Sequence, residues 1–503
     1  MNVAFRVDAS SLIGTGHFMR CLTLADELKQ RGARIHFVSR HLPGNCVELL
    51  ATGNYKYTPL IDSADSSESG DDDYSHWLGT SQQEDAEETI RALSDKAWDW
   101  LVVDHYALSE RWETPLRKIA KRIFVIDDLA NRSHDCDVLL DQNFYEDMDS
   151  RYIGKVSQRC SLLLGPRYAV LREEFYRIRQ TIGPRFGAAK RILVFFGGVD
   201  RNNFTAKTIG VLKDIQDGSI QVDVVLGAQH PFGDQIKSQC ADYGFVCHVQ
   251  STRMADLMGQ ADVAIGAGGV ATWERCCLGL PTLTICTAEN QHKQIADAAG
   301  ECLVYAPDIG DEWSNDIQLH MKALMGNSHL RHLISRNGMK AVDGRGVSRV
   351  VAALGFTDIE IREARQDDEK DIFEWRNDRR VRAASRGSDM IGWEQHQKWF
   401  ASVLRSPDRV LLIGERNGVP VGVVRFDISN NEAEVSIYLV PGMSQSGQGQ
   451  ELLRSAERWL GENRPSVMSL VAEVRGDNER SERLFLGSGY VAKSRWFSKG
   501  IRQ

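Results

Sequence analysis

A glycine turn near the N-terminus carries the first residue with catalytic chemistry. Gly14-Thr15-Gly16-His17 follows an apolar run at residues 3–7 and precedes apolar residues at helical spacing. This pattern predicts a turn between a first strand and a first helix, at the sheet edge where ligands bind. The third glycine of a dinucleotide fingerprint is missing, since position 19 is methionine, and no P-loop lysine follows. His17 is therefore a catalytic candidate, although helix capping or packing fits the spacing equally well.

A second glycine constellation is more specific. Gly266, Gly268 and Gly269 follow another apolar run, and such glycines let backbone amides approach a diphosphate closely. Glu274 lies in the first turns of the next predicted helix, where its carboxylate can accept hydrogen bonds from both hydroxyls of a ribose. Gly279-x-Pro281 ends that helix and starts a strand. The order predicts a nucleotide site, while simple packing of a helix stays open for any single residue.

Length, charge and composition limit the class of protein. A chain of 503 residues exceeds one hydrophobic core, and a net charge of −8 argues against general nucleic-acid binding. The N-terminus lacks signal-peptide features, and no apolar run approaches the roughly 20 residues that span a membrane. All cysteines lie between Cys21 and Cys302 without a C-x-x-C pair, which favours reduced thiols over disulfides or zinc. We therefore expect a cytoplasmic protein without nucleic-acid partner or membrane span.

The elements that position these residues alternate between strand and helix patterns. Two successive series, residues 1–185 and 186–354, predict two Rossmann-like domains facing a cleft. The second series opens on a strand that runs into Gly197-Gly198. From residue 355 the pattern changes to a β-hairpin, with Asn417-Gly418 as its turn signal, and further helices. This change predicts a third, α+β domain over residues 355–503.

Polar residues follow several of the predicted strands, at the ligand-bearing edge of a parallel sheet. Tyr106 and Asn143 are candidates for substrate contact there. Aspartates at strand ends more often cap helices or turns. We find no clear cluster of metal ligands, although Asp127-Asp128 leaves a metal open. The acidic, serine-rich stretch 62–73 predicts a solvated loop.

The glycine loop with Glu274 and Gly279-x-Pro281 resembles the nucleotide-binding half of the GT-B glycosyltransferases that use UDP-N-acetylglucosamine. A closer resemblance, over roughly residues 1–350, is to the UDP-sugar hydrolase family of pseudaminic acid biosynthesis. It implies a GT-B-like pair of Rossmann-like domains and release of UDP from UDP-2,4-diacetamido-2,4,6-trideoxy-β-L-altropyranose. The motifs that carry it are F-R-V-D-A-S-S-x-I-G-T-G-H-x-x-R at the start, L-G-P-R-Y-A-V-L-R-E-E-F from Leu164, F-G-G-V-D from Phe196, and residues 266–281.

This resemblance makes His17 the catalytic residue and implies that the nucleotide rests on Gly268, Gly269 and Glu274, with the sugar facing the N-terminal domain. A neutral histidine can take the proton of an attacking water, and glycine-loop amides can stabilise the departing diphosphate. The scheme requires no metal. Asp8 is a candidate to orient His17 in catalysis and Arg6 to contact substrate, with structural roles as equal alternatives. Further substrate contacts are expected from Gly14, Gly16, Tyr106, Asn143, Gly197, Gly198, Asn290 and Gln291.

The last part of the chain resembles the GNAT acetyltransferases. Residues 444–449 fall where the family carries Q/R-x-x-G-x-G/A, a loop that wraps the pyrophosphate of acetyl-CoA. Residues 478–490 match a later GNAT motif, with Phe485 where many members use a tyrosine to protonate the departing thiolate. Phenylalanine cannot do this, so Tyr438, Tyr490 or an ordered water has to serve. The resemblance implies acetyl-CoA as co-substrate, held by Leu439, Ser444, Gly447, Gln448, Gly449, Asn478 and Ser481, with serine in place of the usual residue at 444.

The opening of this domain, with E-W-R-N-D at residues 374–378, resembles the acetyltransferase of the same pathway. That family acetylates the 4-amino group of UDP-4-amino-4,6-dideoxy-N-acetyl-β-L-altrosamine, and its product is the substrate of the hydrolase. The acceptor amine must lose a proton, so Glu434 and His396 are candidates for the general base. Ordinary surface positions explain these two residues slightly better. Many GNAT domains pair through their sheets, so a homodimer is possible.

Three interpretations follow. The first is a bifunctional enzyme that N-acetylates a UDP-amino sugar and then releases its UDP. The second is a GT-B glycosyltransferase, although the acidic stretch 62–73 disfavours a membrane-bound acceptor. The third is a UDP-sugar hydrolase whose C-terminal domain only binds CoA or a sugar nucleotide, or acetylates another amine, as Ser444 and Phe485 suggest.

Overall fold

The computed structural model describes residues 1–500 except positions 11, 62–73, 216–217, 229, 311, 386–388, 417, 443–447, 475–477 and 494–495. The chain forms two units, Met1–Asp26 with Arg34–Leu354 and Glu27–Ala33 with Gly355–Gln503. The stretch expected to be a solvated loop, Asn417 of the hairpin turn, and the expected pyrophosphate contacts Ser444 and Gly447 lie outside the described residues. The domain boundaries at 185 and 354 stay predictions.

A parallel sheet forms the first half of the first unit. Its strands are short apolar runs because helices cover both faces. The central strand β1 (Asn2–Val7) lies between β2 (Arg34–Ser39) and β4 (Trp100–Asp104), with Val7 opposite Asp104. Within the described residues the sheet order is β3-β2-β1-β4-β5-β6-β7, the remaining strands being β3 (Lys56–Pro59), β5 (Ile123–Ile126), β6 (Val138–Asp141) and β7 (Ser161–Leu164).

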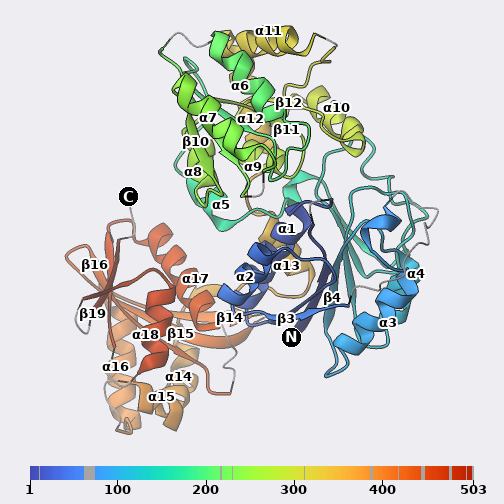
Figure 1. Ribbon diagram of the computed structural model, residues 1–503. Coiled ribbons are helices and arrows are strands. Elements are labelled where there is room, and N and C mark those ends of the chain that lie inside the picture. The colour runs from blue at the N-terminus through green and yellow to red at the C-terminus, as the bar shows by residue number, and fades with distance from the viewer. Residues whose placement is uncertain are drawn as a thin grey trace. The chain divides into compact units, whose positions relative to one another are not determined.

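Helices pack on the two faces of this sheet (Figure 1). On one face Phe18 packs near Phe37 of β2, with ring centroids 6.1 Å apart. On the other face Ala86 and Trp112 join a buried core with Val103 of β4. These contacts come from alternate residues of the strands, which point to opposite faces. The helices are α1 (Gly16–Gln30), α2 (Gly44–Thr52), η1 (Ser75–Trp77), α3 (Gln82–Ala92) and α4 (Glu110–Leu116).

A second parallel sheet completes the first unit. Its order, again in the described residues, is β10-β9-β8-β11-β12. The strands are β8 (Arg191–Phe195), β9 (Gln221–Leu226), β10 (Val246–Val249), β11 (Val263–Ala267) and β12 (Thr282–Ile285). The helices around it are α6 (Phe204–Ile215), α7 (Gly233–Tyr243), α8 (Met254–Gln260), α9 (Ala271–Cys277), η3 (Glu289–Gln291), α10 (His292–Gly300), α11 (Trp313–Gly326) and α12 (Ser328–Ala341).

The chain crosses between the two sheets twice. After η2 (Pro166–Tyr168), helix α5 (Glu173–Arg179) follows the first sheet in sequence, yet its Phe175 packs in the core of the second. Helix α13 (Gly346–Ala353) follows the second sheet and returns to the first, where the Trp100 indole donates to the Leu354 carbonyl at 3.0 Å. The expected GT-B-like pair of Rossmann-like domains is thereby confirmed.

The second unit is built on a mixed sheet, which confirms the expected α+β domain. In the described residues the order is β13-β14-β15-β16-β17-β19-β18, antiparallel except between β16 and β17. The strands are β13 (Glu360–Glu363), β14 (Arg409–Arg416), β15 (Val419–Ser429), β16 (Glu432–Leu439), β17 (Ser469–Glu473), β18 (Val491–Lys493) and β19 (Trp496–Gly500). The helices are η4 (Gln366–Asp368), α14 (Glu369–Asn377), α15 (Arg379–Ala384), α16 (Trp393–Arg405), α17 (Gln448–Asn463) and α18 (Glu479–Gly487).

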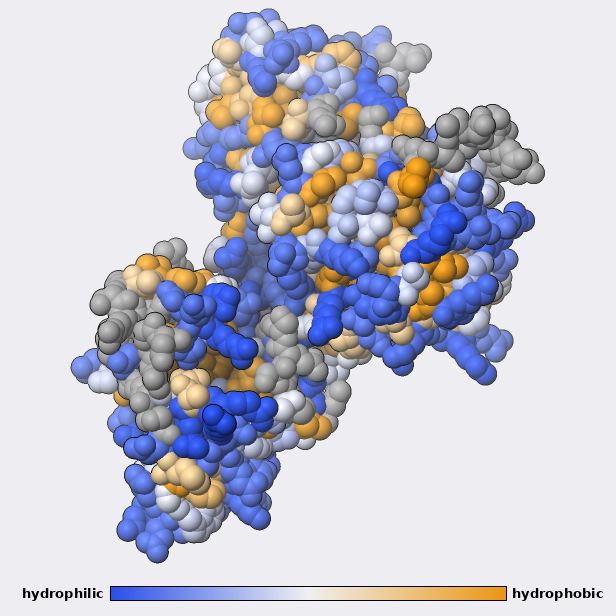
Figure 2. All heavy atoms as spheres, turned by 60° about the horizontal axis from the view of Figure 1, so that its bottom comes forward, coloured by the Kyte–Doolittle hydropathy of each residue, from blue (hydrophilic) through white to orange (hydrophobic). Residues whose placement is uncertain are grey.

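Charged and polar residues dominate the visible surface. On the face drawn in Figure 2, hydrophilic residues prevail and hydrophobic residues occur in smaller groups. Among the helices of the described chain, none combines the length and apolar character that crossing a membrane requires.

Candidate active site

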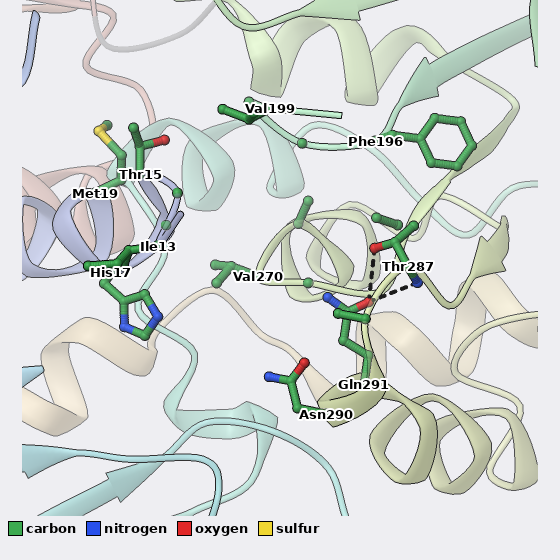
Figure 3. Close-up of a pocket in the computed structure, with 18 of the residues that line it drawn as sticks. Ile13, Thr15, His17, Met19, Phe196, Val199, Val270, Thr287, Asn290 and Gln291 are labelled. Carbon is green, nitrogen blue, oxygen red and sulfur yellow. Dashed lines mark hydrogen bonds between the residues drawn. The ribbon is translucent and has the colours of Figure 1, made fainter. Parts of the chain in front are cut away.

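A cavity of about 730 Å³ lies between the carboxyl ends of the two parallel sheets. The glycine turn before α1 lines one wall, and loops after β8, β11 and β12 line the other. In Figure 3, Thr15 and His17 face Val199, Thr287 and Gln291 across this space. The walls approach closely, since a Cβ added at Gly198 would lie 3.5 Å from Thr15 Oγ1. The sequence-predicted residues that line the cavity are Gly14, Gly16, His17, Tyr106, Asn143, Gly197, Gly198, Gly269, Glu274, Asn290 and Gln291.

His17, in the first turn of α1, pairs with a buried carboxylate. Its Nδ1 lies 2.6 Å from Asp104 Oδ1, and its side chain is 12% exposed, at the cavity wall. When Nδ1–H donates to Asp104, Nε2 carries the lone pair. The histidine is therefore held in the tautomer that can accept a proton at Nε2.

Arg20, one turn further along α1, holds the carboxylate in place. Its Nε and Nη2 donate to the two oxygens of Asp104 at 2.6 and 2.7 Å. Burial alone would raise the pKa of Asp104, but the Arg20 guanidinium and His17 outweigh it and hold that pKa well below its usual range. Asp104 therefore stays ionised and can stabilise an imidazolium on His17.

Asp8 does not orient His17, which corrects that expectation. Asp8 Oδ1 accepts from Arg6 Nη1 at 2.6 Å and from the Arg40 backbone amide at 2.8 Å. Arg6 was expected to contact substrate. It is instead fully buried, also binds Asp85 at 2.7 Å, and does not line the cavity. The reason is burial at the core of β1, where a guanidinium needs carboxylates beside it.

Aromatic rings line the cavity beside His17, and two of them were not predicted. The Tyr106 ring meets the imidazole edge to face, with centroids 4.7 Å apart. Trp77 stacks on Tyr106 at 5.5 Å, and Tyr74 packs against both. All three residues line the cavity. They present apolar faces against which the apolar side of a ligand can pack.

The opposite wall carries most of the residues expected to bind a nucleotide. Glu274 lies 3.9 Å from Arg172, and burial raises the pKa of its carboxyl. Gln291 accepts from the Thr287 amide and hydroxyl at 3.4 and 3.3 Å, which fixes its side chain at the rim (Figure 3). Gly268 does not line the cavity, contrary to expectation, because a Cβ there would lie 2.3 Å from Ile295. Its role is to let helix α10 pack closely.

Asn143 connects the two halves of the first unit. Its side-chain oxygen accepts from the Trp273 indole at 2.9 Å, while its backbone amide donates to Asp141. Trp273 is fully buried in the second half, directly before Glu274. Asn143 thus lines the cavity and also positions the helix that carries Glu274.

A buried acidic cluster lies behind the cavity wall that carries His17, and the pKa of one of its carboxyls is raised. Tyr152 Oη is 3.1 Å from both Asp127 Oδ2 and Asp141 Oδ2. Burial, reinforced by the nearby Asp128 carboxylate, raises the pKa of Asp141 to about 8. The folded protein therefore holds a proton that the unfolded chain loses near pH 4, so this group makes stability fall as pH rises from about 4 to about 8.

Asp141→Asn should remove this pH dependence. Asparagine mimics the protonated carboxyl. The free energy of unfolding of the variant minus that of wild type should therefore increase by about 1 kcal/mol per pH unit between pH 5 and 7.5. Chemical denaturation at four pH values measures the gain. Asp343→Asn is the matched control, because Arg349 lowers the pKa of Asp343 to about 2 and its difference from wild type should stay flat over this range. A flat difference for Asp141→Asn contradicts the assignment.

No group of three or more His, Cys, Asp or Glu side chains suited to hold a metal ion occurs among the described residues. Asp127 is instead engaged by Arg132, with Nη1 to Oδ1 at 2.8 Å, and by the Ala130 amide.

In the second unit, the parallel strands β16 and β17 pair only at their starts. Their register runs from Glu432 opposite Ser469 to Glu434 opposite Val471 and then ends in the described residues. The later part of β16, including Tyr438 and Leu439, therefore diverges from β17. Helix α17 begins at Gln448, soon after β16. A helix start beside an opening in a sheet favours a bound pyrophosphate.

Comparison with known proteins identifies this unit. Residues 358–491 match the acetyltransferase (GNAT) domain family. The C-terminal part of the chain is a GNAT domain.

Three relatives extend the comparison beyond the GNAT domain. An uncharacterized protein of Methanocaldococcus jannaschii is 21% identical over 97% of this chain and 96% of its own length. The spore coat polysaccharide biosynthesis protein SpsG of Bacillus subtilis is 24% identical over 70% of this chain and 98% of its own. The UDP-2,4-diacetamido-2,4,6-trideoxy-β-L-altropyranose hydrolase of Campylobacter jejuni is 30% identical, over 35% of this chain and 54% of the hydrolase. The N-terminal part of the chain is thus homologous to a UDP-sugar hydrolase.

Within the GNAT domain, Tyr438 lies on the sheet face covered by α14 and α16. It packs against a core that contains Phe400 and Val423, and burial raises the pKa of its hydroxyl. Tyr490 is buried and donates to Glu457 at 2.9 Å, next to Phe485. The Tyr490 hydroxyl thus already has a carboxylate partner.

The remaining expected residues have clear local contacts. His396 is buried among aromatic rings, and its Nε2 donates to the Glu369 carbonyl at 2.9 Å, so this nitrogen is not a free base. Asn478 caps α18 by accepting from the Ser481 amide at 3.1 Å. Gln448 is buried at the start of α17, and Gly449 faces Leu484, which a Cβ at position 449 would meet in ordinary contact at 3.6 Å.

Proposed function

We propose that the first unit hydrolyses UDP-2,4-diacetamido-2,4,6-trideoxy-β-L-altropyranose to the free sugar and UDP, with His17 as general base. The observation that carries the proposal is the His17–Asp104–Arg20 chain at the wall of a cavity whose other wall is a glycine loop. The name of the Campylobacter relative supplies the substrate.

The chemistry needs one proton acceptor and a stabilised leaving group. Water attacks C1 of the sugar, and His17 Nε2 takes its proton as the new C1–O bond forms. The bond from C1 to the diphosphate oxygen breaks, and UDP leaves with that electron pair. Asp104 balances the positive charge that forms on His17.

The nucleotide is proposed to lie on the second wall. Gly269 and the Gly197-Gly198 turn bring backbone amides to the cavity, and Glu274 is the acceptor for ribose hydroxyls. The sugar then faces His17 and the rings of Tyr106 and Trp77. Arg172, 3.9 Å from Glu274, is available to turn toward the diphosphate.

For the GNAT domain we propose acetyl-CoA-dependent acetylation of the 4-amino group of UDP-4-amino-4,6-dideoxy-N-acetyl-β-L-altrosamine. The amine attacks the thioester carbonyl, loses a proton, and displaces the CoA thiolate, which takes up a proton. The product is the substrate proposed for the first unit. The Methanocaldococcus relative, which aligns with nearly the whole chain, supports treating the two parts as one enzyme.

Tyr438→Phe tests the proposed proton donor. Loss of the hydroxyl should lower kcat for CoA release about 100-fold, because general acid catalysis contributes roughly 10²- to 10⁴-fold. The KM for acetyl-CoA should change less than twofold. CoA release is followed with a thiol reagent, and Tyr490→Phe serves as the matched control with a smaller loss. Equal kcat values for wild type and Tyr438→Phe exclude Tyr438 as the donor.

The function is tested with the 4-amino sugar nucleotide, following CoA and UDP separately, with and without acetyl-CoA. CoA release followed by UDP release supports both activities and their order. UDP release only from the pre-acetylated sugar supports the hydrolase alone and makes the C-terminal part a binding module or an enzyme for another amine, as Phe485 would favour. Release of UDP that requires an added sugar acceptor supports a glycosyltransferase instead.

A further inference from the structure

Arg275 is a buried cation beneath the glycine loop of the cavity. It lies on α9 and is 2% exposed. Its Nη2 donates to the Ala267 carbonyl at 2.6 Å and to Thr272 Oγ1 at 3.2 Å. Its Nε and Nη1 are buried and have no hydrogen-bond partner within the described part of the chain. The guanidinium is thus held by neutral groups and is only partly satisfied.

Two other arginines buried in the first unit, and close to the cavity wall or the centre of the first sheet, are neutralised by carboxylates. Arg6 binds Asp8 and Asp85, and Arg20 binds Asp104. No carboxylate pairs with Arg275 in the described residues, and the neighbouring Glu274 lies beside Arg172 instead. Burial lowers the pKa of Arg275 to about 10, so it remains charged at neutral pH. A buried charge without a counter-ion is energetically costly. We therefore expect an anion to lie near this guanidinium when a ligand is bound.

The guanidinium lies where the central strands of the second sheet end. A Cβ added at Gly266 would be 2.8 Å from Arg275 Nη1 and 2.0 Å from the Phe195 carbonyl oxygen. The absence of a side chain at Gly266 therefore leaves room for the Arg275 guanidinium. The residues that flank this point, Phe195 and Ala267, both line the cavity, whereas Arg275 does not. The charge thus lies just under the cavity floor.

We propose that Arg275 is a positioning residue for the diphosphate of the bound nucleotide. It fixes the glycine loop through the Ala267 carbonyl and supplies, from below the floor, the positive charge that the diphosphate balances. This inference rests on the proposed binding of UDP in the cavity. It assigns to Arg275 the affinity for the diphosphate and not for the nucleoside.

The test compares UDP with uridine, which lacks the diphosphate. Titration calorimetry on the full chain gives the affinity of wild type and Arg275→Gln for both ligands. The variant should bind UDP at least tenfold more weakly, about 1.4 kcal/mol, and uridine within twofold of wild type. Arg275→Lys, which keeps the charge, should retain most of the preference for UDP.

Arg331→Gln is the matched control. Arg331 is also buried and also donates to backbone carbonyls, Leu324 and Met325 among them, but it does not line or underlie the cavity. Its replacement should leave the ratio of the two affinities unchanged.

Two outcomes overturn the inference while the proposed function stands. One is an Arg275→Gln protein that folds and keeps the wild-type preference for UDP, and the other is an equal loss for UDP and uridine. If Arg275→Gln does not fold, Arg275→Lys decides. A lysine variant that prefers UDP over uridine as wild type does supports a role for the positive charge, and one that loses this preference contradicts it. Failure of wild type to bind UDP instead rejects the proposed function.

Discussion

Replacing His17 with alanine should lower kcat for UDP release about 10³-fold and leave CoA release unchanged. The imidazole is the proposed acceptor of the water proton, held through Nδ1 by Asp104 at 2.6 Å. A positioned general base contributes roughly 10²- to 10⁴-fold. His17 belongs to the first unit, so the CoA release proposed for the GNAT domain checks that the second unit is intact, and circular dichroism checks the fold of the whole variant. UDP release is followed from the pre-acetylated sugar nucleotide.

His248→Ala is the control for this prediction. His248 also contacts an aspartate through a ring nitrogen, with Nε2 2.8 Å from Asp223 Oδ1, but it does not line the cavity. Its loss should change kcat for UDP release less than twofold. A His17→Ala enzyme that releases UDP at the wild-type rate removes the proposed mechanism.

Asp104→Asn should lower kcat for UDP release by roughly 10²- to 10⁴-fold with little change in KM. An amide is nearly isosteric with the carboxylate, but its NH₂ group cannot accept from His17 Nδ1–H, so the proton moves to Nε2. The same substitution beside a catalytic histidine in serine proteases costs about 10⁴-fold. Steady-state kinetics separate kcat from KM, and Asp104→Glu should recover part of the rate because it restores an acceptor.

The matched control is Asp223→Asn. Asp223 also binds an arginine and a histidine, with Arg191 Nε at 2.7 Å and His248 Nε2 at 2.8 Å. The partners of Asp104, His17 and Arg20, line the cavity, whereas Arg191 and His248 do not. A similar loss of kcat in both variants would mean that damage to the fold, and not the orientation of His17, explains the effect.

The local pattern around His17 was predictable from the sequence, but its partner was not. Strand, glycine turn and helix follow directly from apolar spacing, so His17 lies where expected. Asp8 is near in sequence, while Asp104 is 87 positions away. Only the sheet order, which sets β4 beside β1 with Asp104 opposite Val7, brings that carboxylate to α1. An aspartate at the end of a strand signals a ligand edge without revealing which strand is its neighbour.

The glycine loop shows the same limit. Gly268 and Gly269 are adjacent in sequence, and spacing alone assigns both to a nucleotide. In the structure Gly269 lines the cavity, while Gly268 makes room for Ile295. Arg6 likewise has no sequence signal for burial, because its partner Asp85 comes from a distant helix. The roles of Ser444 and Gly447 stay predictions.

The double crossing of the chain between the two sheets has a consequence for catalysis. Because α5 and α13 both bind the sheet to which they do not belong in sequence, the wall with His17 and the wall with Glu274 are tethered at two points. A nucleotide held on one wall therefore meets the histidine at an effective concentration set by the tether geometry and not by encounter in solution.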